Sequence, residues 1–420
     1  MNMLQKLRKE NQAAAFANDV KQYLVNPVKS NSVAPNESYT FDGLTAGYYL
    51  VKDEDGSQTG KTGAYTSFIV QVVGNVTQKT KLDVPTVVKK VQDTNDSTGK
   101  PSGWQDSADY DIGDKVPYQI TGTMPSNIDK YKTYKYEFTD TMSKGLTYTA
   151  KTAKIAIDGT DVTDKFTEAV TTKEDGSTTV TWSCDDLKGA GVALSETSTV
   201  VVTYNCTLNE SAVIGAAGNP NKVTLTFSNN PNQSDGGDTG TTPEDKNIVF
   251  TYKVVVNKVD KDINPLAGAE FTLSKVKADQ TTEVVKTFTL TGDKDTDPTT
   301  FTASGLDDGT YVLKETKTPV GYNTIADQYF TVTAEHDTEK EDPALTSLSG
   351  DKLTGSAETT IKFTADKDAG SLTTDVVNEK GSNLPSTGGR GTRMLYAGGG
   401  VLVACALAII MVIKKRRAIQ

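Results

Sequence analysis

Short runs of alternating β-branched and aromatic residues fill most of this chain, and they constrain its fold more than any other feature. Val, Ile, Thr, Tyr and Phe dominate these runs, and Gly, Asn, Asp and Pro separate them. The clearest runs are 64–73, 134–138, 178–182, 199–204, 222–227, 249–256 and 329–332. A period of two puts alternate side chains on opposite faces of a strand, and punctuated runs of this length are typical of β-sandwiches. We therefore predict an all-β fold of tandem immunoglobulin-like β-sandwich domains.

Chain length and two shifts in composition divide this β-rich region. A single core rarely grows beyond about 250–300 residues, so 420 residues predict two or three domains. One shift lies at Asp83-Val84-Pro85, and the other is the Gly/Asp/Thr-rich segment 233–246, which is typical of a solvated linker. We predict a partial N-terminal domain at 1–84, β-sandwiches at 85–245 and 246–381, a motif and spacer at 382–393, a transmembrane helix at 394–413 and a basic tail at 414–420.

The charge and the scarce histidine and cysteine exclude several classes of protein. The net charge is −10, which disfavours nucleic acid as a partner of the main body. One histidine and three cysteines leave little for histidine-based catalysis or a Cys/His metal site, so we expect no enzyme, cofactor or metal. Cys184 and Cys206 lie on neighbouring predicted strands, where they either pair or stay buried as free thiols.

The C-terminus has three parts in a fixed order. Leu384-Pro385-Ser386-Thr387-Gly388 comes first, an uncharged apolar run at 394–413 follows, and four cations end the segment at 414–417. Twenty helical residues span about 30 Å, the thickness of a bilayer core. The cations favour a cytoplasmic tail, which leaves the rest of the chain outside the cell. A buried core helix is the less favoured alternative.

The N-terminus differs from that of an exported protein. Residues 1–24 carry early cations but no apolar segment of about 7–15 residues, which a signal peptide requires. The pattern favours a short amphipathic helix at 13–24. We expect that the signal peptide is missing and that the first domain is therefore shortened.

Three ionisable or amide side chains of the third segment fall on apolar faces. Alternation places Lys258 with Val254 and Val256, Glu315 with Tyr311 and Leu313, and Asn378 with Thr374 and Val376. The second segment repeats the arrangement with Lys89, Asp140 and Asn221. Lys90 faces the opposite side of its strand, and Asn229 and Asn230 are less favoured candidates for the amide. Burying each group unpaired would cost several kcal/mol, so something must compensate.

The C-terminal motif resembles the cell-wall sorting signal of Gram-positive surface proteins. That resemblance implies a partner sortase, which cleaves between Thr387 and Gly388 and holds the chain as a thioester to its cysteine. It also implies that Leu384 fills an apolar sortase pocket and that Pro385 kinks the peptide. The expected location is the cell wall, after a temporary membrane tether, with peptidoglycan as the final attachment.

The third segment resembles the collagen-adhesin B-type domain of Gram-positive pilins and adhesins. The resemblance rests on its Val-Asn-Lys-Val-Asp opening, on Pro-Leu-Ala-Gly-Ala-Glu-Phe at 265–271 and on the Tyr-x-Leu-x-Glu-Thr-x-x-Pro-x-Gly-Tyr box at 311–322. It implies a spontaneous isopeptide bond between Lys258 and Asn378, assisted by Glu315. Burial favours the neutral forms of amine and carboxyl, so a neutral Glu315 would polarise the Asn378 carbonyl.

The second segment is similar to the isopeptide-forming domain of backbone pilins, which implies a Lys89–Asn221 bond assisted by Asp140. Ordinary buried ion pairs are the alternative at both sites. In backbone pilins a lysine near the end of the first domain resolves the thioester of another subunit, and Lys81 is the best match here, with Lys79 second. The usual Tyr-Pro-Lys signature is absent, and the alternative is that both are solvated surface lysines.

These resemblances imply the shaft subunit of a covalently polymerised, wall-anchored pilus that supports adhesion. Its expected partners are sortase, identical subunits, minor pilins, peptidoglycan and host-surface ligands. The first alternative is a monomeric wall-anchored adhesin that binds host or matrix ligands. A wall-anchored enzyme is the second, and no hydrolase-type constellation of residues favours it.

Overall fold

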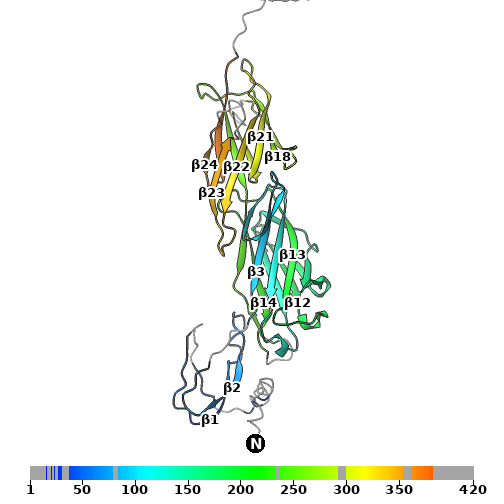
Figure 1. The fold of residues 1–420 in the computed structure, drawn as a ribbon, viewed down its shortest axis with the longest axis vertical. Coiled ribbons are helices and arrows are strands. Elements are labelled where there is room, and N and C mark those ends of the chain that lie inside the picture. The colour runs from blue at the N-terminus through cyan, green and yellow to red at the C-terminus, as the bar shows by residue number, and fades with distance from the viewer. Residues whose placement is uncertain are drawn as a thin grey trace, which may run out of the picture.

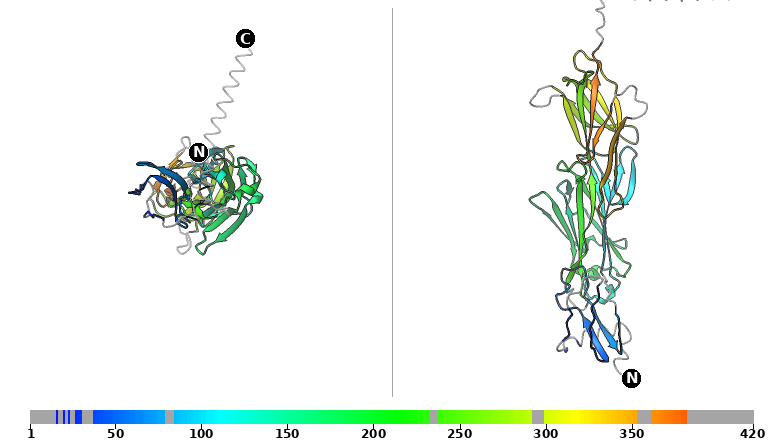
Figure 2. Two further views of the ribbon diagram at one scale, coloured as in Figure 1. Left: turned by 90° about the horizontal axis from the view of Figure 1, so that it is seen from below. Right: turned by 90° about the vertical axis from the view of Figure 1, so that its left-hand side faces the viewer.

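The computed structural model describes residues 27–30, 37–78, 84–231, 237–291, 299–352 and 361–381, together with three isolated positions near the N-terminus. Three β modules are stacked end to end in one elongated molecule, from β1 and β2 at the N-terminal end to β18–β24 at the other (Figure 1). The turned view in Figure 2 shows the same stacking. The all-β class and the tandem sandwiches are confirmed.

Several predicted segments lie outside the described residues. These are nearly all of the amphipathic helix at 13–24, the two candidate polymerising lysines Lys79 and Lys81, and everything from the sorting motif to the basic tail. In the part of the chain that is described, no helix has the length and apolarity needed to cross a bilayer.

The first module is a two-stranded antiparallel sheet of β1 (Gly47–Lys52) and β2 (Ser67–Val72). The loop between these strands pairs with the second module through backbone hydrogen bonds. The Gly60 N–H donates to the Thr239 carbonyl at 2.8 Å, and the Tyr65 N–H donates to the Asn229 carbonyl at 2.8 Å. The first module is therefore joined to the second by strand-like contacts as well as by the chain.

The second module is a sandwich of two seven-stranded sheets. One sheet has the order β10-β9-β13-β6-β3-β4, with β8 on β13; the other has the order β11-β12-β7-β14-β16-β5, with β15 on β14. The first sheet contains β3 (Val87–Asn95), β4 (Lys100–Gln105), β6 (Lys115–Thr123), β8 (Leu146–Tyr148), β9 (Lys154–Ile157), β10 (Thr160–Asp161) and β13 (Thr199–Leu208). The second contains β5 (Ser107–Asp109), β7 (Tyr136–Met142), β11 (Thr167–Thr172), β12 (Thr178–Cys184), β14 (Asn219–Ser228), β15 (Thr239–Thr241) and β16 (Asp245–Phe250). Short 3-10 turns lie at Ile128–Lys130, Thr163–Lys165 and Leu187–Ala190.

Alternation builds the core of this sandwich. Every second residue of β6, β7 and β13 is buried, and Thr and other polar residues fill many of the positions between them. The core between the sheets is rich in aromatic rings, including Trp182 on β12 and Tyr204 on β13, whose ring centroids are 5.3 Å apart. Aromatic and β-branched side chains suit a pleated surface with one wet face, so the sequence and the sheets agree locally.

The third module packs a four-stranded sheet, β20-β17-β25-β24, against a five-stranded sheet, β19-β18-β21-β22-β23. Its strands are β17 (Tyr252–Asp260), β18 (Glu270–Val276), β19 (Thr282–Thr289), β20 (Thr300–Leu306), β21 (Gly309–Lys317), β22 (Gln328–His336), β23 (Leu345–Lys352), β24 (Thr364–Asp366) and β25 (Ser371–Asn378). The first and last strands, β17 and β25, pair in parallel, with Lys258 beside Val376. The chain therefore enters and leaves this module through neighbouring strands.

Two predictions about the second module are wrong. The predicted linker and boundary near residue 245 fall within the sandwich, because β15 and β16 both pair with β14. For the same reason, the predicted single run at 249–256 is divided between two strands, β16 and β17, which meet at Thr251. Cys184 and Cys206 do not lie on neighbouring strands, since β12 and β13 belong to opposite sheets, and both are buried free thiols. Composition marked the segment as polar, but its backbone still completes the sheet.

Candidate functional sites: two buried lysine–carboxyl–asparagine clusters

The first cluster joins the two sheets of the second module. Lys89 comes from β3 in one sheet, whereas Asp140 and Asn221 come from β7 and β14 in the other, and all three are fully buried. The Lys89 Nζ donates to Asp140 Oδ1 at 2.5 Å and to the Tyr204 hydroxyl at 2.5 Å. The Asn221 Nδ2 donates to the same hydroxyl at 3.0 Å. The structure therefore brings the three predicted residues into one cluster.

Aromatic rings keep this cluster dry. The Lys89 Nζ lies 5.0 Å from the ring centroid of Tyr118 and 5.1 Å from that of Tyr204. Burial lowers the pKa of Lys89, although the charge of Asp140 opposes this effect. Burial raises the pKa of Asp140, and Lys89 opposes that effect in turn. Desolvation thus favours a neutral amine beside a neutral carboxyl, the pair that a nucleophilic attack by lysine requires.

The second cluster lies within the third module, between β17, β21 and β25. Lys258 and Asn378 are fully buried, and Glu315 is 5 % exposed. The Asn378 Nδ2 donates to both Glu315 oxygens, at 3.0 and 3.1 Å. The Lys258 Nζ donates to the carbonyl oxygen of Val376 at 3.1 Å, on the strand that carries Asn378. The parallel pairing of β17 with β25 therefore puts the amine and the amide on one face, two positions apart.

Burial lowers the pKa of Lys258 to about 8, while the charges of Glu315 and Asp260 oppose the effect. About a tenth of this amine is therefore neutral at pH 7. The Asn378 Oδ1 and the Asn221 Oδ1 are buried, and neither has a hydrogen-bond partner among the described residues. A buried carbonyl oxygen without a donor is costly, and both sites share this feature.

The orientation of Asn378 differs from the expected one. The sequence interpretation had a neutral Glu315 donating to the Asn378 carbonyl oxygen, but it is the Nδ2 group that faces Glu315. A half-turn of the carboxamide would exchange Nδ2 and Oδ1 and give the expected contact. In the observed orientation, Glu315 contacts the nitrogen that would leave as ammonia.

The sequence analysis missed two residues of the first cluster. The hydroxyl of Tyr204, on β13, touches Lys89, Asp140 and Asn221, and it donates to Asp140 Oδ2 at 2.5 Å. Asn247, on β16, lies directly across from Asn221 and is fully buried, with neither side-chain polar atom hydrogen-bonded within the described part of the chain. Tyr204 was part of a predicted strand, but no local signal connects its hydroxyl with a lysine 115 positions away.

The less favoured candidates lie elsewhere. The Lys90 Nζ pairs with Asp106 at 2.7 Å on the outer side of the strand. The Asn229 Nδ2 donates to the carbonyls of Gln58 and Gly63 in the first module, at 2.9 and 3.0 Å. Asn230 is 7 % exposed and its Nδ2 donates to Asp238 at 3.4 Å. The contacts of Asn229 therefore help to join the first two modules.

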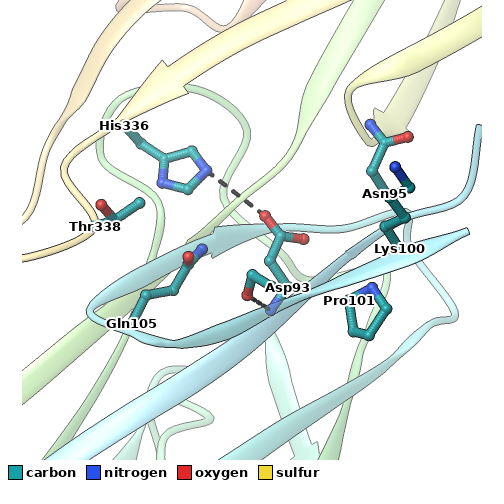
Figure 3. Close-up of a pocket in the computed structure, with 8 residues that line it drawn as sticks. Asp93, Asn95, Lys100, Pro101, Gln105, His336 and Thr338 are labelled. Carbon is teal, nitrogen blue, oxygen red and sulfur yellow. Dashed lines mark hydrogen bonds and ion pairs between the residues drawn. The ribbon is translucent and has the colours of Figure 1, made fainter. Parts of the chain in front are cut away.

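An acidic cluster at the junction of the second and third modules was not predicted. Asp93, Asp109 and His336 each offer a ligand atom within 4.8 Å of the others. Asp93 and His336 also line a cavity of about 300 Å³ (Figure 3). The His336 Nε2 lies 3.6 Å from Asp109 Oδ1 and 3.8 Å from Asp93 Oδ2. Carboxylates with an imidazole are a donor set that divalent cations accept. Without a cation, the same groups pair across the junction and hold β3 and β5 to β22.

A second acidic group at this junction is neutralised by a lysine. The Lys275 Nζ lies 2.7 Å from Asp111 and 3.1 Å from Asp307, with Asp96 at 3.6 Å. Although burial acts against it, these carboxylates raise the pKa of Lys275, so it stays charged. This buried lysine is thus an ion-pair residue that spans the modules, unlike Lys89 and Lys258, which lie beside an amide.

Comparison with known proteins agrees with this architecture. Residues 112–231 match the family described as Gram-positive pilin backbone subunit 2, Cna-B-like domain, and residues 252–344 match the prealbumin-like fold domain. The trypsin-resistant surface T6 protein of Streptococcus pyogenes serotype M6 is 26% identical over 405 residues, which cover 81% of this chain and 71% of that protein.

One solved pilin structure shares the fold, and a second aligns with a lower score. The T6 backbone pilin of S. pyogenes serotype M6 aligns with a TM-score of 0.56 and 19% identity, covering 88% of each chain. The full-length major pilin SpaD from Corynebacterium diphtheriae aligns with a TM-score of 0.47 and 22% identity, covering 81% of each chain. The sequence comparisons therefore match a Gram-positive pilin backbone domain at 112–231 and a prealbumin-like domain at 252–344, in a chain that is similar over most of its length to a streptococcal surface protein.

Proposed function

We propose that this chain is the shaft subunit of a sortase-assembled, wall-anchored pilus and that two internal isopeptide bonds staple it, Lys89–Asn221 and Lys258–Asn378. The observation that carries the proposal is the burial, in both sandwiches, of a lysine amine with a carboxyl and an asparagine amide. Homology to backbone pilins supports the shaft role.

The chemistry balances at each site. The neutral lysine Nζ attacks the asparagine Cγ, a C–N bond forms, and the carboxamide nitrogen leaves as ammonia. One proton leaves the attacking amine and one joins the departing nitrogen, so the carboxyl can carry the proton without net change. The product is an uncharged amide, which removes the cost of burying an ammonium group.

The two bonds would resist tension in different ways. In the third module the bond joins neighbouring parallel strands at the end of the last strand, so a pull along the chain bypasses residues 259–377. In the second module it joins opposite sheets, and β14 is followed by β15 and β16. The hydrogen bonds that join β16 to β14 and β5 therefore lie in the path of the load.

Assembly would join a residue that follows the third module in the sequence to a lysine that lies between β2 and β3 in the sequence. We propose that a sortase cleaves after Thr387 and transfers its carbonyl to Lys81 of a neighbouring copy, with Lys79 as the second choice. Peptidoglycan and minor pilins complete the list of proposed partners. Figure 1 shows the first module and the C-terminal end of the third module at opposite ends of the molecule, as head-to-tail polymerisation requires.

Intact mass tests the internal bonds. Each Lys–Asn bond releases one ammonia, so two bonds remove about 34 Da from the chain. Asn221→Ala and Asn378→Ala should each lack about 17 Da, instead of about 34 Da, relative to the mass calculated from the variant's own sequence. A wild-type mass equal to that of the unmodified chain would refute both bonds.

A ladder of SDS-resistant species on Gram-positive cells that express this chain with its sortase tests the shaft role. The double variant Lys79→Ala plus Lys81→Ala should abolish the ladder and keep single subunits attached to the wall. Lys61→Ala, an exposed lysine of the same module, is the matched control and should leave the ladder intact. A ladder that persists in the double variant would favour a different lysine, and the absence of a wild-type ladder would favour the monomeric adhesin.

A further inference from the structure

The Tyr204 hydroxyl occupies the centre of the first cluster. It lies 2.5 Å from the Lys89 Nζ, 2.5 Å from Asp140 Oδ2 and 3.0 Å from the Asn221 Nδ2. These three atoms are the nucleophile, the proton carrier and the leaving group of the proposed reaction. A single hydroxyl in contact with all three is placed to move a proton between them.

The ring of Tyr204 is fixed by its neighbours. It stacks on Tyr118 with centroids 5.3 Å apart and meets Tyr148 edge to face at 5.6 Å. The residue is 4 % exposed, so bulk water does not compete for the hydroxyl. Burial raises the pKa of Tyr204 well above its usual value, with Asp140 adding to the effect, which keeps the hydroxyl protonated.

We propose that Tyr204 is a catalytic residue of Lys89–Asn221 bond formation, acting as the proton relay between Asp140 and the departing amide nitrogen. This inference rests on the proposed isopeptide bond. Asp140 begins as the neutral acid beside the neutral Lys89 amine. In the resting arrangement the Tyr204 hydroxyl donates to Asp140 Oδ2 and accepts from the Asn221 Nδ2, and both hydrogen bonds reverse during the reaction, because Nδ2 gains a lone pair once Cγ becomes tetrahedral. As Nζ attacks Asn221 Cγ, its proton passes to Asp140 Oδ1, and the proton on Oδ2 passes to the Tyr204 oxygen.

Tyr204 gives its own proton to the Asn221 Nδ2, and ammonia leaves as the C–N bond forms. Asp140 and Tyr204 end as they began, each with one proton, so the step needs no external acid or base. The only bond broken between heavy atoms is Cγ–Nδ2, and the only one formed is Nζ–Cγ.

The second cluster explains why the first one uses a hydroxyl. There the Asn378 Nδ2 donates directly to both oxygens of the acid, Glu315, and also to the Asn323 carbonyl at 2.8 Å. Asp140 is one methylene shorter than Glu, and in the first cluster the Asn221 nitrogen bonds to the Tyr204 hydroxyl instead. Tyr204 therefore extends the reach of the shorter acid.

The test compares full-length wild type, Tyr204→Phe and Tyr148→Phe. Tyr148→Phe is the matched control, because it removes a hydroxyl from the same aromatic cluster that donates to Glu168 at 2.7 Å. Freshly synthesised chains are sampled over time, and tryptic mapping quantifies the Lys89–Asn221 and Lys258–Asn378 linked peptides separately. We expect Tyr204→Phe to slow the first bond by about 10²-fold, the usual scale of general acid–base catalysis, with the second bond unchanged as an internal control of folding and timing.

A second variant separates an effect on catalysis from an effect on folding. 3,5-Difluorotyrosine incorporated at position 204 retains the ring and the hydroxyl but makes the hydroxyl more acidic, so a relay predicts a changed rate and pH profile for the first bond. Wild-type kinetics in both altered proteins would overturn the relay, as would equal slowing in Tyr148→Phe. If wild type itself forms no Lys89–Asn221 peptide, the proposed bond fails, and the relay with it.

Discussion

Replacing Asn221 with alanine removes the amide of the first cluster and leaves the buried Lys89–Asp140 pair in place. The change therefore removes the proposed staple without leaving a charge unpaired. Lys89 and Asn221 are 132 positions apart in the sequence. By the loop-closure relation for a cross-link, closing a loop of this length stabilises the folded state by about 5 kcal/mol, through the entropy of the unfolded chain.

The expected loss converts into a melting temperature. Unfolding entropy near the midpoint is about 2.1 cal/mol/K per residue, so a module of roughly 165 residues has about 0.35 kcal/mol/K. A loss of about 5 kcal/mol then lowers the melting temperature of the second module by about 14 °C. Differential scanning calorimetry measures the shift, and intact mass shows whether the variant has regained about 17 Da.

Asn247→Ala is the matched control. Asn247 is the cross-strand neighbour of Asn221 and is as deeply buried, but its amide has no hydrogen-bond partner within the described residues. Its removal should keep the ammonia loss and cost below about 1 kcal/mol, because a buried amide without a partner contributes little. If Asn221→Ala regains the mass but melts within a few degrees of wild type, the loop-closure reasoning is refuted. If Asn247→Ala is the variant that regains the mass, the assigned amide is wrong.

Three further predictions concern pH and the junction between modules. Because the pKa of Lys258 is lowered to about 8, the rate of its bond formation should rise about tenfold for each unit that the pH rises towards 8, and it should level off above that. A flat profile from pH 6 to 8 would contradict a neutral amine nucleophile. Burial and the neighbouring Asp109 raise the pKa of Asp93 to about 8, so the folded state holds a proton that the unfolded chain releases near pH 4. The free energy of unfolding should therefore fall as the pH rises from about 4 to 8, by up to about 1.4 kcal/mol per unit. Chemical denaturation of Asp93→Asn should show a flatter slope. Burial lowers the pKa of His336, but the carboxylates of Asp109, Asp93 and Asp308 together raise it more. The net rise adds a further loss of stability as the pH rises above the usual histidine range. Gly215 has φ +90, and an added Cβ would lie 2.5 Å from a carbonyl oxygen of the third module. Gly215→Ala should therefore destabilise the fold by about 2–3 kcal/mol in a thermal melt, while the mass lost as ammonia stays the same. An unchanged melting temperature would argue against this close contact.

The period-two pattern was enough to predict the buried faces that carry both lysines. Alternation is a local property of the backbone, and one wet face and one dry face follow from it wherever a strand covers a core. The positions of Lys89, Asp140 and Asn221 on dry faces could therefore be predicted without knowing which strands meet. The third module was predicted more sharply, because its tyrosine-bounded box around Glu315 is a specific motif.

What strand periodicity leaves open is which dry faces meet. The place of β16 in the second sheet depends on backbone hydrogen bonds to β14 and β5, and the polar composition of the preceding segment indicated a linker instead. Tyr204 reaches Lys89 only because β13 and β3 both flank β6, and Asn247 faces Asn221 only through sheet pairing. The Asp93–Asp109–His336 cluster needs both modules in contact. Sequence alone indicated most strands and their buried faces, because these follow from neighbouring residues. Tertiary structure decided which groups share a site, because that depends on contacts between residues on different strands, 51 positions apart for Lys89 and Asp140 and 115 for Lys89 and Tyr204.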